Sequence, residues 1–544
     1  MASGKSRMVT LSSLRPHQAA ALADFYARMQ MRWQEVQAVV AAPGADWGQR
    51  LQAVLSNMGE LWILPCRSGK TRAALTALYH WDEWCQSWGV PDDWHRAPHL
   101  VLAPSELVRD GAWGQDWAAV CPPWDPRSKI SGPHERATAG LYLVPTEDNL
   151  DNVQPLPGSI VVATYPTLSH RQPFFDRDWN VIVSDEIHRL KNPSADWTQA
   201  AYKLRSFARL GLSATPFTNY VHELRHVLAW LQGWTVGDRR LSATWPNQQN
   251  WEDRFCSYIW TRGKNGFRRI PAGAKNPEFL YHLLRAEVMY SAPQQVISDA
   301  PEPVFRPIAV PLSPKQEEIY RQLEGGMVRW LNGHGQVDEH DVGPQLAQIL
   351  YLMEVCADAR LLEISITKRR GNDNILSHAD IQPLFSRDWN IEDSNSKLKA
   401  LKWILDNNEG QVLVLTGFAQ LARTLARELG GEAITGASRD RQGTVARFKS
   451  GETRLVFCTK AAWEGITLAA PTVVLYGFVD YTPGLVKQAI RRAWTMFDTE
   501  PVTVYDLYAS GTVEDWNRQR LARKDSATAV LTNGIELPMF REDN

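Results

Sequence analysis

The sequence predicts an α/β protein with two lobes, each built on a doubly wound parallel sheet. Two sets of short apolar runs alternate with helix-favouring stretches, one in the first half of the chain and one in its last third. The chain has 544 residues, which is too many for one ordinary core. Several runs end in hydroxyl or carboxylate residues, at the end of a strand where open α/β sheets bind ligands.

The first expected strand, Leu61 to Leu64, leads through a short loop into a helix that begins near Lys70. The loop ends in Gly69-Lys70-Thr71, and main-chain N–H groups at such a helix start attract phosphates. Lys70 is expected to reach the β and γ phosphates of a nucleotide, and the Thr71 hydroxyl to bind Mg²⁺. The full phosphate-loop pattern has a glycine five residues before Gly69, where this chain has Leu64.

Three more apolar runs are expected strands with small polar residues at their ends, namely 99–105, 160–165 and 210–216. Their hydroxyl groups are candidates for contact with a nucleotide or a nucleic-acid backbone. Taken singly, each is equally well a helix cap or a turn residue.

The stretch from Val181 to Asn192 begins as a buried strand and ends in two adjacent carboxylates. Asp185 is suited to hold Mg²⁺ through water, and Glu186 to orient and deprotonate an attacking water. Alone, such a pair is most often a solvated strand end. Together with Gly69-Lys70-Thr71, it predicts a site that hydrolyses a nucleoside triphosphate.

The second set of elements predicts a second α/β lobe without a phosphate loop. The expected strands are 411–415, 454–460, 472–476 and 501–507, and the expected helices are 419–429 and 484–494. The second helix carries Gln488, Arg491 and Arg492. We expect the first lobe at 1–228, helical protrusions and a linker at 229–390, the second lobe at 391–525 and a tail at 526–544. Within the middle region, 315–323 and 345–362 are expected helices, and 260–276 is expected to be a mobile DNA-facing loop or a disordered surface loop.

Composition restricts the class of protein. The formal net charge of -1 gives no global attraction to nucleic acid, so any such binding must use a local basic surface. The candidate surfaces, each equally well a solvated loop, are Arg262, Lys264, Arg268 and Arg269, and the run Lys368, Arg369 and Arg370. The 23 tryptophans suit core packing better than base stacking. Six dispersed cysteines, with no zinc or disulfide spacing, favour a reducing compartment.

The order of these motifs resembles superfamily-two helicases and translocases, and most closely the Swi/Snf group of duplex-DNA translocases. It runs from L-R-P-H-Q at residues 14–18 through G-K-T, A-P-S, A-T-Y, D-E-I-H and S-A-T-P to T-G-F and Q-A-I-R-R-A. Three stretches favour the Swi/Snf group: D-E-I-H-R-L-K-N at 185–192, S-K-L-K-A-L at 396–401 and V-T-V-Y-D-L-Y-A-S-G-T-V-E-D at 502–515. The resemblance covers about residues 11–230 and 300–520.

This resemblance implies two RecA-like lobes, ATP and Mg²⁺ as cofactors, and roles for individual residues. Gln18, with Arg15 nearby, would contact adenine, and Ser68, Gly69, Lys70 and Thr71 would hold the phosphates. Thr71 and Asp185 would hold the metal, and Glu186 the water. His188 would link the nucleotide site to Ser213 and Thr215. The second lobe would contribute Gly465 near the γ-phosphate, with Gln488 and Arg492 completing catalysis.

The resemblance also implies contacts to nucleic acid, for which the matching positions are Pro104, Ser105, Thr164, Thr416, Thr459 and Trp463. Two features depart from the family pattern. A further arginine is usual three positions after Arg492, where this chain has Thr495, and the glycine-rich turn before Gly465 is filled by Ala462 and Trp463. The assignment of an arginine finger therefore depends on Arg492.

The expected function is ATP-driven translocation on DNA, with duplex DNA as the partner and no membrane association. The first alternative is a strand-separating DNA or RNA helicase of the same superfamily. The second is a nucleic-acid-binding scaffold with a decayed ATPase site, which Leu64 and Thr495 favour and the retained catalytic residues oppose. The lack of accessory-domain motifs predicts a bacterial or phage source and a cytoplasmic location, or a nuclear one in a eukaryote.

Overall fold

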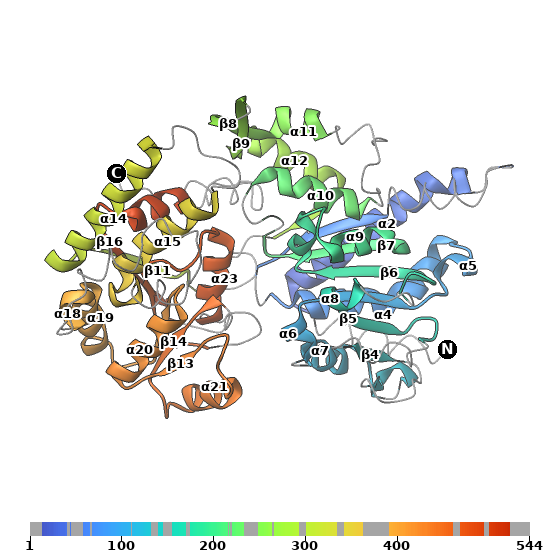
Figure 1. Cartoon of the computed structure of the whole chain (residues 1–544). Coiled ribbons are helices and arrows are strands. Elements are labelled where there is room, and N and C mark those ends of the chain that lie inside the picture. Colours follow the sequence, from blue (N-terminus) through green and yellow to red (C-terminus); the bar gives the residue numbers. More distant parts are fainter. Residues whose placement is uncertain are drawn as a thin grey trace. The chain divides into compact units, whose positions relative to one another are not determined.

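The protein divides into two compact units, each with its own parallel sheet (Figure 1). In the part that is described, the first unit comprises residues up to 257 and 271–292, and the second comprises 258–270 and 301–522. The structure is a computed structural model that describes residues 14–40, 44, 58–65, 68–109, 111–123, 125–131, 140–144, 155–169, 174–215, 217, 220–232, 248–263, 266–292, 301–333, 342–362, 391–460, 468–493 and 500–522.

The first unit holds an eight-stranded sheet whose strand pairs are all parallel. In spatial order its strands are β10 (Met289–Ser291), β1 (Gly59–Ile63), β7 (Arg205–Ser213), β6 (Asp178–Asp185), β2 (His99–Ala103), β5 (Ile160–Thr164), β4 (Leu141–Val144) and β3 (Ile130–Ser131). Ile63 is in register with Ser213, and Leu212 with Asp185. The carboxyl ends of β1, β7 and β6 therefore meet at one edge of the sheet.

Helices cover both faces of this sheet. On one face, α2 (Pro16–Val40), α4 (Lys70–Trp88) and α7 (Ala112–Val120) share a core with alternate strand residues. On the other, α10 (Val221–Leu231) contacts β1 and β7. The other described helices of the unit are α5 (Asp92–His95), α6 (Ser105–Arg109), η1 (Pro126–Ser128), α8 (Tyr165–Leu168), η4 (Ile187–Lys191), α9 (Asp196–Lys203), α11 (Gln248–Phe255) and α12 (Pro277–Glu287).

Tryptophan side chains fill much of this first core. Trp62 from β1 meets Phe25 of α2 edge to face, with ring centroids 5.7 Å apart, and Trp81 of α4 packs on the same phenyl ring. Each buried aromatic side chain contributes roughly 1.5–3 kcal/mol through removal from water. Core packing is therefore confirmed for the fully buried tryptophans, which are Trp33, Trp62, Trp81, Trp113, Trp117, Trp230 and Trp251.

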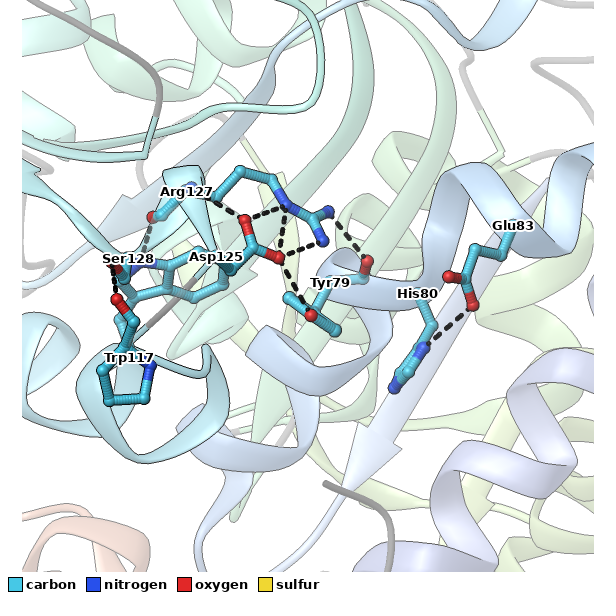
Figure 2. Close-up of polar contacts among 8 residues, drawn as sticks. Tyr79, His80, Glu83, Trp117, Asp125, Arg127 and Ser128 are labelled. Carbon is cyan, nitrogen blue, oxygen red and sulfur yellow. Dashed lines mark hydrogen bonds and ion pairs between the residues drawn. The ribbon is translucent and has the colours of Figure 1, made fainter. Parts of the chain in front are cut away.

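A polar cluster ties the middle of α4 to the turn after α7 (Figure 2). The Tyr79 hydroxyl donates to Asp125 Oδ2 at 3.0 Å, and Arg127 Nη2 pairs with the same oxygen at 2.8 Å. The Arg127 guanidinium lies 4.2 Å from the Tyr79 ring centroid, while Trp117 Nε1 donates to the Arg127 carbonyl at 2.9 Å. Burial and the Asp125 carboxylate raise the pKa of Tyr79 to about 12, which keeps the phenol a donor. The helix that follows the phosphate loop is thus anchored at its middle.

The second unit holds a six-stranded sheet, again parallel throughout. One core cluster involves α19 (Lys397–Asp406) and α20 (Ala419–Leu429), and the other α21 (Arg441–Ser450) and α23 (Pro483–Ala493). Two doubly wound parallel sheets confirm the predicted fold class. In spatial order the strands are β11 (Val304–Val310), β16 (Thr503–Ala509), β15 (Thr472–Tyr476), β12 (Val412–Leu415), β14 (Leu455–Cys458) and β13 (Glu432–Ile434).

The segment between the two sets of motifs contains strands as well as helices. The expectation of a loop at 260–276 is wrong, because β8 (Cys256–Gly263) and β9 (Gly266–Ala274) form a two-stranded sheet. The residue types of Tyr258, Ile259 and Trp260 favour a strand. The glycines and basic residues of the same segment had suggested a loop. The segment also supplies β10 to the first sheet and β11 to the second. Its other helices are α14 (Pro314–Gly333), α15 (Val342–Ala357) and α18 (Ile391–Ser394).

Some predicted features fall outside the described residues, namely Lys264, the run 368–370 and the tail 526–544. Within the part of the chain that is described, no helix is long and apolar enough to cross a bilayer.

Candidate active site

The phosphate loop between β1 and α4 turns at Gly69, whose φ of 78° and ψ of 35° are left-handed. Glycine adopts this conformation readily because it has no Cβ to clash with the main chain. The turn places Lys70 and Thr71 in the first turn of α4, at the carboxyl end of β1. The N–H groups of that turn have no partner within the helix, so they are suited to bind phosphate oxygens.

Lys70 is buried and folds back over this loop. Its Nζ donates to the carbonyl oxygens of Leu64 at 3.0 Å and Pro65 at 3.1 Å. A phosphate would offer the ammonium group charged acceptors, which bind more strongly than neutral carbonyls. Leu64 occupies the position where the full pattern has glycine, and its side chain lies in the core of the first unit. Its N–H donates to the Ser213 carbonyl at 3.0 Å, which joins the loop to the end of β7.

The start of α2 contacts the phosphate loop through two side chains. Gln18 Nε2 donates to the carbonyls of Ser68 and Gly69, both at 3.1 Å, and its Oε1 accepts from the Arg15 N–H at 2.9 Å. His17 Nε2 lies 2.7 Å from the Ser68 carbonyl oxygen. The predicted nucleotide residues Arg15, Gln18, Ser68 and Gly69 are thus brought together. His17 was missed as a site residue, although its place beside Gln18 in L-R-P-H-Q was a usable signal.

The predicted metal carboxylate, Asp185, ends β6 and is 4% exposed. Burial, together with the Glu186 charge, raises its pKa to about 7, although the Lys70 charge opposes the shift. Among the described residues, no cluster of three or more histidine, cysteine or acidic side chains could cage a metal ion. A Mg²⁺ site does not need such a cluster, because proteins usually hold this ion by one or two carboxylates together with substrate phosphates and water.

The side chains at this edge fit a magnesium nucleotide. Asp185 and Thr71 are oxygen donors of the kind that Mg²⁺ prefers, and a cation would stabilise the Asp185 anion that burial disfavours. In addition, Ser68 Oγ is buried in the phosphate loop and has no hydrogen-bond partner among the described residues. When bound, Mg²⁺ would neutralise charge on the β and γ phosphates.

Glu186 adjoins the end of β7 through two other side chains. Its Oε2 lies 3.4 Å from His188 Nδ1 and 3.4 Å from Ser213 Oγ, and those two atoms are themselves 3.4 Å apart. Ser213 Oγ also accepts from the Thr215 N–H at 3.0 Å and lies 2.7 Å from the Thr215 carbonyl oxygen. The predicted coupling residues His188 and Ser213 thus contact the predicted water-activating carboxylate directly, and Thr215 contacts Ser213.

The candidate nucleic-acid contacts of the first unit lie at the ends of β2 and β5. Thr164 is 2% exposed, and its Oγ1 accepts from the Thr167 N–H at 3.3 Å as the N-cap of α8. Its side chain therefore serves as a helix cap, which was the alternative for strand-end hydroxyls. Pro104 is buried and Ser105 is half-buried at the start of α6. A nucleic-acid role for these three residues stays a prediction.

The candidate residues of the second unit are only partly described. Thr416 and Thr459 are buried at the carboxyl ends of β12 and β14, which are neighbouring strands. Gln488 and Arg492 lie four residues apart on α23, with Gln488 half-buried and the Arg492 side chain outside the described part. Trp463, Gly465 and Thr495 lie outside the described residues altogether. Their assigned roles stay predictions.

Two family models match the chain, one after the other. The family model for the SNF2-related domain matches residues 16–361, and the model for the helicase conserved C-terminal domain matches residues 396–496. The SWI2/SNF2 ATPase core of Sulfolobus solfataricus in complex with dsDNA is a solved structure that aligns over 96% of this chain and 94% of its own, at 16% identity and a TM-score of 0.36.

Two curated relatives cover most of the chain. A mouse protein, the SWI/SNF-related matrix-associated actin-dependent regulator of chromatin subfamily A member 1, is 23% identical over 77% of this chain and 37% of its own length. The DNA repair and recombination protein RAD54-like of Drosophila erecta is 24% identical over 80% of this chain and 56% of its own length. The chain thus spans about a third to a half of these relatives. Because the SNF2-related domain alone accounts for more than half of the residues, the chain belongs to the SNF2-related family.

Proposed function

We propose that this protein is a nucleic-acid-stimulated ATPase that translocates on double-stranded DNA. The observation that carries the proposal is the alignment of three neighbouring strand ends. The loop after β1 leads to Lys70 at the start of α4, and β6 ends in Asp185, which Glu186 follows. Strand β7 lies between β1 and β6 and ends in Ser213. A phosphate-binding loop, a metal carboxylate and a water-activating carboxylate at one sheet edge are the protein groups that nucleoside triphosphate hydrolysis requires.

Each group of the first unit has a distinct part in this proposal. Gln18 and Arg15 bind the adenine, and Ser68 with the first turn of α4 binds the phosphates. Lys70 neutralises the β and γ phosphates, and Thr71 and Asp185 hold Mg²⁺. Glu186 orients the attacking water and accepts its proton. His188 and Ser213 then transmit the state of Glu186 to the end of β7, supported by their mutual 3.4 Å contacts.

The second unit supplies the groups that stabilise the transition state. Gln488 and Arg492 lie one helical turn apart on α23, so they share a helix face. An arginine brought to the γ-phosphate accelerates hydrolysis by roughly 10³ to 10⁵. If this arginine is available only in one arrangement of the units, hydrolysis is tied to their movement. Thr416 and Thr459 would then hold the DNA backbone in one unit while Pro104, Ser105 and Thr164 hold it in the other.

The choice of duplex DNA over other nucleic acids has separate support. The motif D-E-I-H-R-L-K-N at 185–192 resembles that of duplex-translocating enzymes. A relative at 24% identity is named a DNA repair and recombination protein. The formal net charge of -1 implies that DNA is bound by a local basic surface, which makes the stimulation sensitive to salt.

The test measures ATP turnover by the full chain alone, with duplex DNA, with single-stranded DNA and with RNA. Duplex DNA should stimulate most, and Lys70→Ala and Glu186→Gln should abolish turnover, whereas the exposed Lys449→Ala should match wild type.

Displacement of a triplex-forming strand without separation of the duplex identifies translocation, and release of a labelled duplex strand identifies a helicase. DNA binding without ATP turnover would identify a scaffold, and undiminished turnover in Glu186→Gln would refute the assigned site.

A further inference from the structure

Tyr165 forms a directed hydrogen-bond chain beneath the catalytic carboxylates. Its hydroxyl donates to the main-chain carbonyl of Asp185 at 2.6 Å and lies 2.7 Å from Ser184 Oγ. A phenol has a single proton. Because this proton goes to the carbonyl, the Ser184 hydroxyl must donate to the phenol oxygen. The tyrosine side chain is 1% exposed, so water cannot replace either bond.

The carbonyl that Tyr165 binds belongs to the peptide unit that joins Asp185 to Glu186. The N–H of the same unit donates to Asp185 Oδ1 at 3.1 Å. Both polar ends of this one peptide group are therefore occupied, which fixes the plane of the group. Glu186 follows with a φ of 53° and a ψ of 55°, in the left-handed region that non-glycine residues rarely adopt. Such a conformation persists only when its surroundings determine it strongly.

Other contacts hold Tyr165 itself in place. Thr164 caps the helix in which Tyr165 is the first residue. The Arg189 guanidinium lies 5.9 Å from the Tyr165 ring centroid. Burial raises the pKa of Tyr165 far above its ordinary value, so the hydroxyl keeps its proton and acts as a donor.

We propose that Tyr165 is a positioning residue for ATP hydrolysis. By holding the Asp185–Glu186 peptide, it keeps Glu186 in the left-handed conformation from which the carboxylate reaches His188 and Ser213. The nucleotide itself contacts other groups in the proposed site, namely Lys70, Thr71 and Gln18. Tyr165 therefore affects the chemical step and not ATP binding. This inference rests on the proposed ATPase function.

The first test compares Tyr165→Phe with wild type in steady-state ATP hydrolysis with duplex DNA. The phenyl ring retains the packing, and the substitution removes the hydroxyl together with its bonds to the Asp185 carbonyl and to Ser184 Oγ. We expect kcat to fall about 10- to 100-fold, because small displacements of a catalytic group cost that much, with KM for ATP unchanged within about twofold. Tyr142→Phe is the matched control, since Tyr142 is a buried tyrosine of the same sheet whose hydroxyl has no hydrogen-bond partner in the described part of the chain. It should leave kcat unchanged.

The second test does not depend on turnover. Hydrogen exchange of the nucleotide-free protein should be faster in the peptide covering 183–190 in Tyr165→Phe, but not in Tyr142→Phe, because the Glu186 N–H is released. Ser184→Ala removes the donor to the phenol and keeps the bond to Asp185, so a loss of kcat of about threefold is expected. If Tyr165→Phe does not fold, kcat of Ser184→Ala tests the inference in its place.

The outcomes separate this inference from the proposed function. Wild-type kcat and exchange in Tyr165→Phe, with Glu186→Gln inactive, would overturn the role of Tyr165 alone. Turnover that survives in Glu186→Gln would overturn the ATPase assignment itself. A Tyr165→Phe protein with raised KM and unchanged kcat would place the residue in nucleotide binding and would also refute the inference.

Discussion

Lys397 and Glu514 form a buried ion pair in the second unit, with Lys397 Nζ 2.9 Å from Glu514 Oε2 and side chains that are 0% and 2% exposed. Lys397 also donates to the Cys356 carbonyl, and Glu514 accepts from the N–H groups of Ala509 at 2.8 Å and Phe478 at 3.3 Å. The pair joins the start of α19 to the segment after β16. Lys397 belongs to the S-K-L motif and Glu514 to the G-T-V-E-D motif, and the two residues are 117 positions apart in the sequence.

Removing one member of this pair should destabilise the protein strongly. In Lys397→Met, the Glu514 carboxylate stays buried without its partner charge, and such losses cost about 3–5 kcal/mol. Lys315→Met is the control, because Lys315 pairs with Asp393 at 3.0 Å where both side chains are about half exposed, and exposed pairs contribute about 1 kcal/mol or less. Urea unfolding of the two variants checks this. Equal losses would show that burial does not strengthen the Lys397–Glu514 interaction.

Elements with a strong local pattern were predictable from the sequence. The expected helix 419–429 and strand 472–476 coincide with α20 and β15, because apolar spacing and strand length agree there. The strand ends carrying Asp185 and Ser213 were found for the same reason. Their contact was not derivable, since it depends on β7 lying beside both β1 and β6.

Features that depend on distant contacts or unusual backbone were not predictable. Glu186 is left-handed, and Tyr165 donates to the Asp185 carbonyl from 20 positions earlier in the sequence. Neither glutamate nor tyrosine as a residue type signals such a conformation. The short edge strand β10 was missed because three residues carry too little pattern. The β8–β9 pair was missed because glycine and arginine content was given more weight than the aromatic and β-branched residues.

Gly69 should tolerate no side chain without a loss of ATP affinity. A Cβ at this position would lie 2.0 Å from Gln18 Nε2, and the positive φ is strained for alanine. Gly89 at the other end of α4 has a similar φ of 73° with open space around it, so Gly89→Ala imposes the strain alone. Both variants should lose about 1 kcal/mol of stability, whereas only Gly69→Ala should raise KM for ATP. Thermal unfolding and ATPase kinetics measure these effects, and an equal KM in both variants would contradict the Gln18 contact.

Ser213 should matter for turnover beyond its effect on stability. Ser213→Ala removes the hydroxyl that contacts Glu186 and His188, and we expect DNA-stimulated kcat to fall about tenfold. Ser438 is a matched control because its hydroxyl accepts from the Thr435 N–H at 2.9 Å and donates to the Ala433 carbonyl at 3.1 Å, in the second unit. Ser438→Ala should lose similar stability with unchanged kcat. A Ser213→Ala protein with wild-type turnover would refute the coupling role.

Glu60 should make the stability of the first unit depend on pH. It lies fully buried on β1, where Trp62 Nε1 donates to its Oε1 at 3.0 Å. Burial raises its pKa to about 7 from an ordinary value of 4.5, although the Arg32 charge opposes the shift. Between these two values the folded protein binds more protons than the unfolded chain. The contribution of Glu60 to stability is therefore present below about pH 4.5 and is lost as the pH rises through about 7.

Glu60→Gln should remove this dependence, because glutamine retains the shape and cannot ionise. Relative to Glu60→Gln, wild type should become less stable by up to about 3 kcal/mol between pH 5 and pH 8. Thermal unfolding midpoints of both proteins at several pH values measure the difference, and Glu409→Gln at an exposed position serves as the control. Parallel curves for wild type and Glu60→Gln would show that Glu60 stays ionised throughout, held by the charges of Arg32 and of Arg28, whose Nε lies 3.9 Å from Glu60 Oε2.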